Sequence, residues 1–203
     1  MMRLRAPIVV IALAMGMGSA CIDSTSPHFQ RPAIAAGSAH TCRLATSGLV
    51  SCWGVNYRGQ LGDGLIDAGS TTPVSVIGGL RFNTLAAGGA ETCGIVESGD
   101  AYCWGMNSSG QIGNGSTTDS PAPATVSGGL HFITLSVSGT HVCGLTSAWV
   151  AYCWGENEGG RLGTGDTTDS ATPIPVAGGL RFRVIAAGGG HTCAITTAGL
   201  AYC

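Results

Sequence analysis

Residues 37–64 read G-S-A-H-T-C-R-L-A-T-S-G-L-V-S-C-W-G-V-N-Y-R-G-Q-L-G-D-G, and closely similar stretches begin at Gly88 and at Ser138. A fourth copy begins at Gly188 and runs to Cys203. Repeats of about 50 residues are typical of folds in which each unit buries its apolar face only by stacking on its neighbours. We therefore divide residues 34–203 into repeats at about 37–87, 88–137 and 138–187, with a partial repeat at 188–203.

Two cysteines separated by 10 positions recur in every repeat, and each pair flanks a turn between two predicted strands. Side chains alternate along a strand, so a hairpin that pairs Cys42 with Cys52 also places neighbouring apolar residues together on one face. Directly opposed cysteines in a non-hydrogen-bonded pair lie close enough to be linked. We expect four disulfides, one in each repeat: Cys42–Cys52, Cys93–Cys103, Cys143–Cys153 and Cys193–Cys203.

The segment W-G-x-N-x-x-G-Q-L-G-x-G, preceded by H-T-C and a hairpin, resembles the repeat of the regulator of chromosome condensation family. The resemblance covers residues 34–203 and implies an all-β fold, a β-propeller that in this family usually has about seven four-stranded blades. Kelch repeats have a similar period but lack the G-Q-L-G segment. This chain holds about three and a half repeats, so we expect a partial or open propeller, or a fragment of a larger seven-bladed propeller protein. Its open blade edges would favour self-association.

The repeated motif residues have structural roles in this interpretation. The tryptophans are expected to pack between blades, because a buried indole contributes a large apolar area. The asparagines are expected to cap turns through hydrogen bonds from side chain to backbone. These residues are Trp53, Trp104 and Trp154, and Asn56, Asn107 and Asn157.

Histidines stand two residues before a cysteine in three repeats, at His40, His141 and His191. Zinc binding is one interpretation, although zinc sites usually use cysteines roughly two to four residues apart. We expect instead that each histidine forms a hydrogen bond within its own blade. The sequence therefore predicts neither a metal nor another cofactor.

The N-terminus is typical of an export signal, because Arg3 and Arg5 precede an apolar run at 8–17 and the small residues of 18–20. The segment G-S-A-C at 18–21 resembles a bacterial lipobox, with glycine in place of the usual leucine. Cys21 is also the one cysteine of nine that the repeats leave unpaired. We expect a signal peptide at 1–20, a lipid-attachment cysteine and tether at 21–33, and a lipid-anchored protein of the bacterial cell envelope. Simple secretion, or residence in the periplasm, is the alternative.

The composition excludes several functions. All nine basic side chains counted as Lys or Arg are arginine, and the formal charge is −2. A phosphate-loop lysine and a Schiff-base lysine are therefore absent, and nucleic acid is disfavoured as a partner. No catalytic motif is present, so we do not expect an enzyme.

The sequence is best interpreted as an exported protein-binding or scaffold module. Secreted bacterial relatives that it resembles inhibit β-lactamases, which makes an inhibitor-like binder the more specific form of this hypothesis. Trp149 stands in a hairpin turn where the other repeats have glycine, and it is either an exposed anchor or part of a rearranged turn. Arg81, His131 and Arg181 share one repeat position and form either a basic arc for an anionic partner or solvated strand edges. A carbohydrate-binding or hydrolytic envelope protein is the alternative, although only 6% of residues are aromatic.

Overall fold

The structure is a computed structural model that describes residues 33–203. The predicted signal peptide, the predicted lipid-attachment residue Cys21 and nearly all of the predicted tether lie outside the described residues. Within the described part, no helix has the length and apolar character needed to cross a membrane.

The described chain forms four antiparallel sheets, and in each sheet the strands follow one another in chain order. The first sheet contains β1 (Ala33–Ala36), β2 (His40–Leu44), β3 (Val50–Asn56) and β4 (Asp67–Ser75). The second contains β5 (Phe82–Ala87), β6 (Glu91–Val96), β7 (Ala101–Gly105) and β8 (Ser120–Thr125). The third contains β9 (Phe132–Val137), β10 (His141–Thr146), β11 (Ala151–Gly155) and β12 (Ser170–Pro175), with the short 3-10 helix η1 (Glu158–Gly160) between its last two strands. The fourth contains β13 (Phe182–Ala187), β14 (Thr192–Thr196) and β15 (Ala201–Tyr202).

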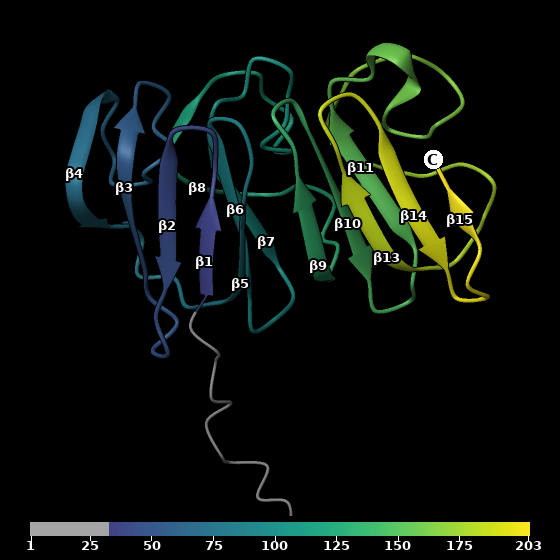
Figure 1. The fold of residues 1–203 in the computed structure, drawn as a ribbon, viewed down its shortest axis with the longest axis horizontal. Helices are drawn as coiled ribbons and strands as arrows, with labels where there is room; N and C mark the ends of the chain where they lie inside the picture. The colour runs from purple at the N-terminus through teal and green to yellow at the C-terminus, as the bar shows by residue number, and fades with distance from the viewer. Residues whose placement is uncertain (1–32) are drawn as a thin grey trace, which may run out of the picture.

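The sheets stack face to face like the blades of a propeller (Figure 1). The first strands of successive sheets contact one another, β1 with β5, β5 with β9 and β9 with β13, so these strands lie innermost. The prolines of the repeats lie in the outermost strands β4, β8 and β12, which have a neighbouring strand on one side alone within the described sheets, and proline is tolerated in such edge strands. The fold is the all-β, partial propeller that the repeats predict.

The blades do not coincide with the sequence repeats that begin at 37, 88 and 138. The stretch 82–87 at the end of the first repeat is β5, which is the innermost strand of the second sheet. Likewise β9 and β13 end their sequence repeats but begin new sheets. Each repeat therefore links two neighbouring blades covalently.

The middle hairpin of each sheet has the predicted register. In the first sheet Cys42 pairs with Cys52 and Leu44 pairs with Val50. All four predicted disulfides are present, each with a Cα–Cα distance of 4.1 Å. Six of these eight cysteines are fully buried, so the bonds of the first three sheets lie inside the stack.

The glycine of each Trp-Gly pair is required by a close approach of two backbones. Gly105 has φ +103°, and a Cβ at this position would lie 2.3 Å from the carbonyl oxygen of Ala90. The pairing of β7 with β8 shifts register between Cys103 and Gly105, which bends the strand where the indole leaves it. Any larger residue here would push the hairpin apart.

Candidate functional site

Two of the three motif tryptophans pack between neighbouring sheets, as predicted. We call the interface between two neighbouring sheets a joint. The Trp104 Nε1–H donates to the carbonyl oxygen of Gln60 in the preceding repeat at 3.0 Å, and its ring is fully buried against Phe82. The Trp154 Nε1–H donates in the same way to Gln111 at 2.8 Å. Trp53 belongs to the first sheet, which no sheet precedes within residues 33–203, and it is only half-buried. Trp104 and Trp154 therefore each join their own sheet to the one before it.

The repeated histidines also act between sheets. The predicted bond within one blade is present at His141, whose Nδ1 lies 2.8 Å from Ser138 Oγ in the turn between β9 and β10, whereas Nδ1 of His40 has no hydrogen-bond partner among the described residues. His40 Nε2 lies 2.8 Å from Thr92 Oγ1 of the second sheet. His141 Nε2 lies 2.8 Å from Thr192 Oγ1 of the fourth sheet. Burial lowers the pKa of both imidazoles to about 4, so both rings are neutral near pH 7. His191 has the same repeat position on the last sheet and is exposed.

The joint between the second and third sheets departs from this pattern, and sequence reasoning missed it. Glu91 stands at the histidine position and Val142 at the threonine position. Glu91 is fully buried, its Oε2 accepts from the backbone N–H of Ala90 at 3.1 Å, and its Oε1 has no hydrogen-bond partner among the described residues. Burial raises the pKa of this carboxyl to about 8. The paired change from His–Thr to Glu–Val was visible in the repeat alignment.

The motif asparagines hold the loop after the third strand of each of the first three sheets. The Nδ2–H₂ of Asn107 donates to the carbonyl oxygens of Ser116 and Thr118, both at 2.9 Å. Its Oδ1 accepts from the backbone N–H of Ile112 at 2.8 Å. Asn56 and Asn157 accept from Leu61 and Leu162 in the same way. The predicted bonds from side chain to backbone are therefore present, and all three asparagines are buried.

Trp149 occupies the hairpin turn of the third sheet without rearranging it. Its backbone N–H donates to the carbonyl of Thr146 at 2.8 Å, and the glycine of each other sheet makes the equivalent bond. Its φ is +62°, which makes it the one non-glycine residue with positive φ among residues 33–203. The ring is 43% exposed. The rearranged-turn interpretation was therefore wrong, whereas a partly covered ring is what the structure shows.

The three residues of the predicted basic arc lie beside the hairpin turns of the preceding sheets. Arg81 Nη1 donates to the carbonyl of Ser47 at 2.5 Å, and Arg181 Nη1 donates to that of Ala148 at 2.9 Å. His131 Nδ1 lies 3.2 Å from Asp100 Oδ1. These side chains are therefore engaged with the turns rather than only solvated.

The hairpin turns and the loops beside them form one edge of the molecule, at the bottom of Figure 1. We call it the hairpin rim and define it by the turns at 45–49, 96–100, 146–150 and 196–200 and the loops at 77–82, 127–132 and 177–182. The hairpin rim carries Arg81 and Arg181. It also carries the exposed apolar side chains of Leu49, Trp149, Leu180 and Leu200. The structure thus brings Trp149, Arg81, His131 and Arg181 onto one rim.

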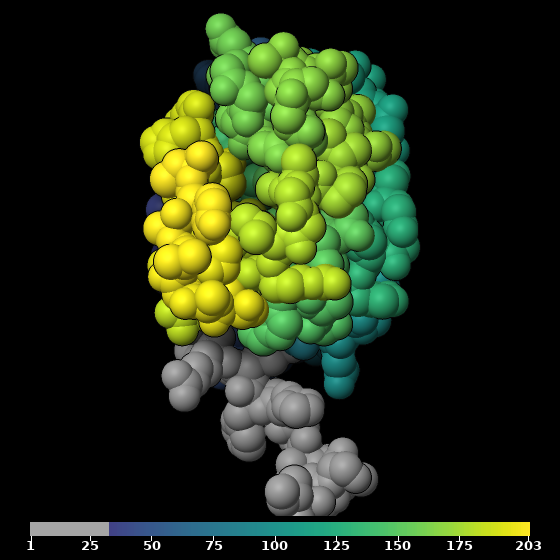
Figure 2. Space-filling view, turned by 90° about the vertical axis from the view of Figure 1, so that its right-hand side faces the viewer, coloured from purple at the N-terminus to yellow at the C-terminus, as the bar shows by residue number. Residues whose placement is uncertain are grey.

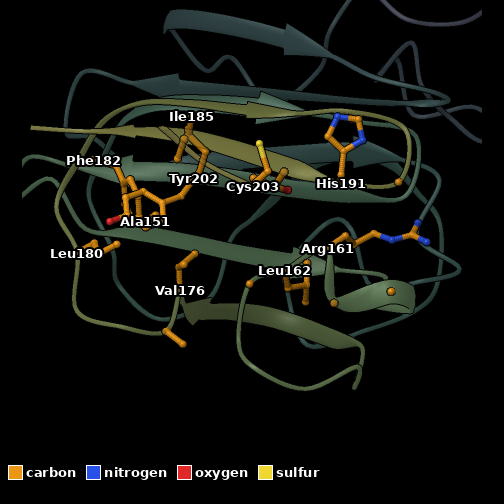
Figure 3. Close-up of a pocket in the computed structure, with 17 residues that line it drawn as sticks. Ala151, Arg161, Leu162, Val176, Leu180, Phe182, Ile185, His191, Tyr202 and Cys203 are labelled. Atoms are coloured by element: carbon orange, nitrogen blue, oxygen red, sulfur yellow. The ribbon is translucent and has the colours of Figure 1, made fainter. Parts of the chain in front are cut away.

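A pocket of about 310 Å³ lies between the third and fourth sheets. Figure 2 shows the surface hollowed between the yellow C-terminal residues and the green third sheet. Its walls are mainly apolar, with Leu162 and Val176 on one side and Ile185 and Tyr202 on the other (Figure 3). Within the described part of the chain, no group of three or more His, Cys, Asp or Glu side chains could hold a metal ion.

Comparison with protein families matches two models of one description, the regulator of chromosome condensation (RCC1) repeat. One model matches residues 98–145 and 150–195, and the other matches 33–60 and 83–111, so together they cover more than half of the chain. Among curated proteins, the chain is 37% identical over 87 residues to the ultraviolet-B receptor UVR8 of Arabidopsis thaliana, covering 42% of this chain and 20% of the receptor. It is 40% identical over 78 residues to RCC1 domain-containing protein 1 of Mus musculus, covering 37% of this chain and 20% of that protein.

Solved structures agree on the fold. The yeast RCC1 protein Prp20, bound to Kap60, superposes with a TM-score of 0.73 at 21% identity, covering 84% of this chain and 42% of that one. Human WBSCR16 superposes with the same TM-score at 22% identity, covering 84% of this chain and 46% of that one. The chain thus spans less than half of these structures and about a fifth of the curated relatives named above. The matched repeats, the sheet order and the shared superposition show that this chain belongs to the regulator of chromosome condensation repeat family.

Proposed function

We propose that this chain is a non-catalytic protein-binding module and that the hairpin rim is the surface that contacts its partner. The observation that carries the proposal is the backbone of Trp149. A non-glycine residue with positive φ costs on the order of 1 kcal/mol or more. The other three turns avoid this cost with glycine, at Gly48, Gly99 and Gly199. A large aromatic ring held there at a cost in stability, and exposed, has the properties of an interface anchor.

The chemistry around Trp149 supports a protein partner. Arg181 is anchored by Ala148, next to Trp149 in the chain, so a guanidinium and an indole lie on the same turn. Leu180 and Leu200 add exposed apolar surface to the same rim. Interface cores are rich in Trp and Arg, which combine large contact area with hydrogen-bonding capacity. The partner surface that fits is an apolar pocket with carboxylates at its margin.

The relatives are consistent with protein binding. Prp20p from Saccharomyces cerevisiae was described together with its binding properties to Gsp1p and histones. This chain is 21% identical to Prp20p and covers 42% of it, which establishes a shared fold. The partners named for Prp20p are those of that protein. An inhibitor-like binder of a secreted enzyme remains the more specific form of our proposal.

Export to the bacterial cell envelope through a lipid on Cys21 is also part of the proposal. Disulfides persist mainly in oxidising compartments, and four of them in this chain favour an exported protein. Labelling with an alkyne-modified palmitate should mark the wild-type protein and leave Cys21→Ser unlabelled. Equal labelling of the two proteins would contradict lipidation at this residue.

Self-association through the open blade edges completes the proposal. The two ends of the stack are complementary, because His191 at one end and Thr41 at the other hold the positions that form His–Thr bonds at the internal joints. Sedimentation of the wild-type protein should show assembly that Thr41→Val weakens. A monomer at every concentration would contradict this part of the proposal.

The test of the binding function compares two substitutions that copy residues from other repeats. Trp149→Gly copies the glycine of the other turns, and Tyr57→Ser copies Ser108 while removing an exposed aromatic from the opposite edge. Wild-type protein is used to capture partners from an envelope extract, and the affinity of a purified captured protein is then measured by calorimetry. Trp149→Gly should weaken binding at least tenfold, whereas Tyr57→Ser should not change it. Equal affinity of all three proteins, or strong polysaccharide binding without any protein partner, would contradict the proposal.

A further inference from the structure

The three joints among residues 33–203 do not bury the same ionisable group. We number them in chain order, so the first joint lies between the first and second sheets. The first joint buries His40, whose Nε2 lies 2.8 Å from Thr92 Oγ1, and the third joint repeats this pair of residue types. The second joint buries Glu91 instead, and Val142 stands at the threonine position. An acid therefore replaces a base at the second joint.

Glu91 lies where the second sheet touches the third. Beside it, the backbone N–H of Gly89 donates to the carbonyl oxygen of Ser138 at 3.1 Å. A Cβ on Gly89 would lie 2.9 Å from the Cα of Gly139 and 3.6 Å from Glu91 Oε2. Glu91 Oε1 and the buried Nε2 of Gln111 have no hydrogen-bond partner among the described residues. The closed second joint therefore offers little to stabilise a negative charge on this carboxyl.

The elements packed around Glu91 supply no opposite charge. The strands β5 and β9, the turn at 138–140 and the loop at 106–113 contain no titratable side chain. Tyr102 on β7 packs edge-on against Phe82 of its own sheet, and His141 on β10 bonds to Ser138 and to the fourth sheet. Burial is therefore the main cause that raises the pKa of Glu91 to about 8.

The surroundings of His40 are also free of a charge that faces the ring. The strands β1, β3 and β5 contain no side chain that ionises near neutral pH, and Tyr57 and Arg58 in the adjoining loop are exposed. Glu91 follows β6 one residue before Thr92, and neighbouring side chains of a strand point to opposite faces. Burial alone therefore lowers the pKa of His40 to about 4.

His141 at the third joint has charged neighbours. Burial is the largest cause that lowers its pKa to about 4, and the charges of Arg161 and His191 act in the same direction. Glu156, which is paired with Arg161 at 2.6 Å, acts in the opposite direction. The first and third joints therefore both favour a neutral imidazole when they are closed.

We propose that pH selects which joint of the stack opens: ionisation of Glu91 opens the second joint as the pH rises, and protonation of His40 and His141 opens the first and third joints as the pH falls. Repeat folds are held mainly by contacts between neighbouring units, so one joint can open while the others stay closed. Opening transfers the buried group to water, where it takes up its charge. The joints and not the hairpin rim carry this device, so it can fail without affecting the proposed function.

The pKa values set the pH window of each opening. An opening equilibrium that depends on one buried group changes about tenfold per pH unit between the pKa of that group in water and its pKa in the closed joint. For the second joint this window runs from 4.5 to about 8, and opening becomes more favourable as the pH rises. For the first joint it runs from about 4 to 6.5, and opening becomes less favourable as the pH rises.

Two buried indoles report on the first and second joints separately. The Trp104 Nε1–H donates across the first joint to Gln60, and the Trp154 Nε1–H donates across the second joint to Gln111. Both rings are fully buried. Hydrogen–deuterium exchange of these two protons is followed by NMR in the full chain from about pH 5 to about pH 8. Each rate is divided by that of free N-acetyltryptophanamide, which gives a protection factor.

The protection factor of Trp154 should fall about tenfold or more between about pH 5.5 and about pH 7.5. That of Trp104 should rise over the acid part of this range and then stay constant, because its joint buries a histidine. Equal protection of the two indoles at every pH would overturn the proposal, since it would show that both exchange only when the whole stack unfolds.

Substitutions at the second joint assign the effect to the buried acid. Glu91→Gln should remove the pH trend at Trp154 and leave that of Trp104 unchanged, whereas the exposed control Glu97→Gln should keep both trends. Glu91→His combined with Val142→Thr copies the first joint and should reverse the trend at Trp154. If this double variant does not fold, Glu91→Gln decides alone. A fall of Trp154 protection with rising pH that persists in Glu91→Gln would overturn the proposal.

Discussion

Replacing Glu91 should change how the free energy of unfolding depends on pH, because Glu91, His40 and His141 are buried and have shifted pKa values. Burial raises the pKa of Glu91 from its ordinary 4.5 to about 8, so the folded protein keeps a proton there that the unfolded chain has lost. Folding is therefore penalised as the pH rises from 4.5 to 8. Burial lowers the pKa of His40 and His141 from 6.5 to about 4, so these two groups penalise folding as the pH falls below 6.5.

The three groups together predict a maximum of stability near pH 6.5. Above it the Glu91 contribution dominates, and the last protons that the two histidines lose in the unfolded chain offset part of it, since a one-proton difference alters the folding equilibrium about tenfold per pH unit. The free energy of unfolding should therefore fall by about 1 kcal/mol between pH 6.5 and pH 8. Below the maximum the two histidines outweigh the opposite effect of Glu91, so stability falls again toward acid.

Glu91→Gln resembles the protonated carboxyl in shape and cannot ionise. We expect this variant to lose the decline above pH 6.5 and to keep the decline on the acid side, which becomes steeper. The measurement is urea unfolding at a series of pH values on both sides of the maximum. Glu97→Gln, an exposed change in the following turn, serves as the control and should keep the wild-type profile. The reasoning is refuted if Glu91→Gln and the wild type lose stability equally between neutral and alkaline pH.

Three further substitutions test the joints and turns by denaturant unfolding. Trp154→Ala should lower the free energy of unfolding by about 3–5 kcal/mol, because it leaves a cavity between two sheets. Trp53→Ala, at a half-buried position, should lower it by less than half as much. Equal losses would contradict the described packing between sheets. Asn107→Ala should cost about 2–4 kcal/mol because three backbone groups lose their partner, and Asn114→Ala, which removes one bond from the backbone N–H of Ser116, should cost less. Trp149→Gly should raise stability by about 1 kcal/mol by relieving positive φ, and a loss of stability would show that the ring has a packing role instead.

The repeat made most of the architecture predictable. Four cysteine pairs at one spacing fixed the hairpin register, and the Trp-Gly segment fixed the family and the four-stranded plan. The periodic pattern did not show where a blade begins. The repeat has the same length and the same residues whether its boundary is placed before or after the strand at 82–87. That boundary depends on which strand pairs with which, and only the sheet order shows that β5 opens the second blade.

The candidate site was less predictable than the fold. The glycine-to-tryptophan change at 149 marked an unusual turn, but its backbone conformation could not be known from the sequence. Contacts between repeats were also hidden, since the bond from His40 to Thr92 joins residues 52 positions apart.

The most direct test of the central claim is hydrogen–deuterium exchange of the protein with and without its captured protein partner. Our account predicts that binding protects the backbone of the hairpin rim, above all the turn at 146–150 and the loop at 177–182. The loops on the opposite edge, at 57–70 and 108–119, should exchange at the same rate in both states. Protection confined to those opposite loops, with the hairpin rim unchanged, would contradict the account.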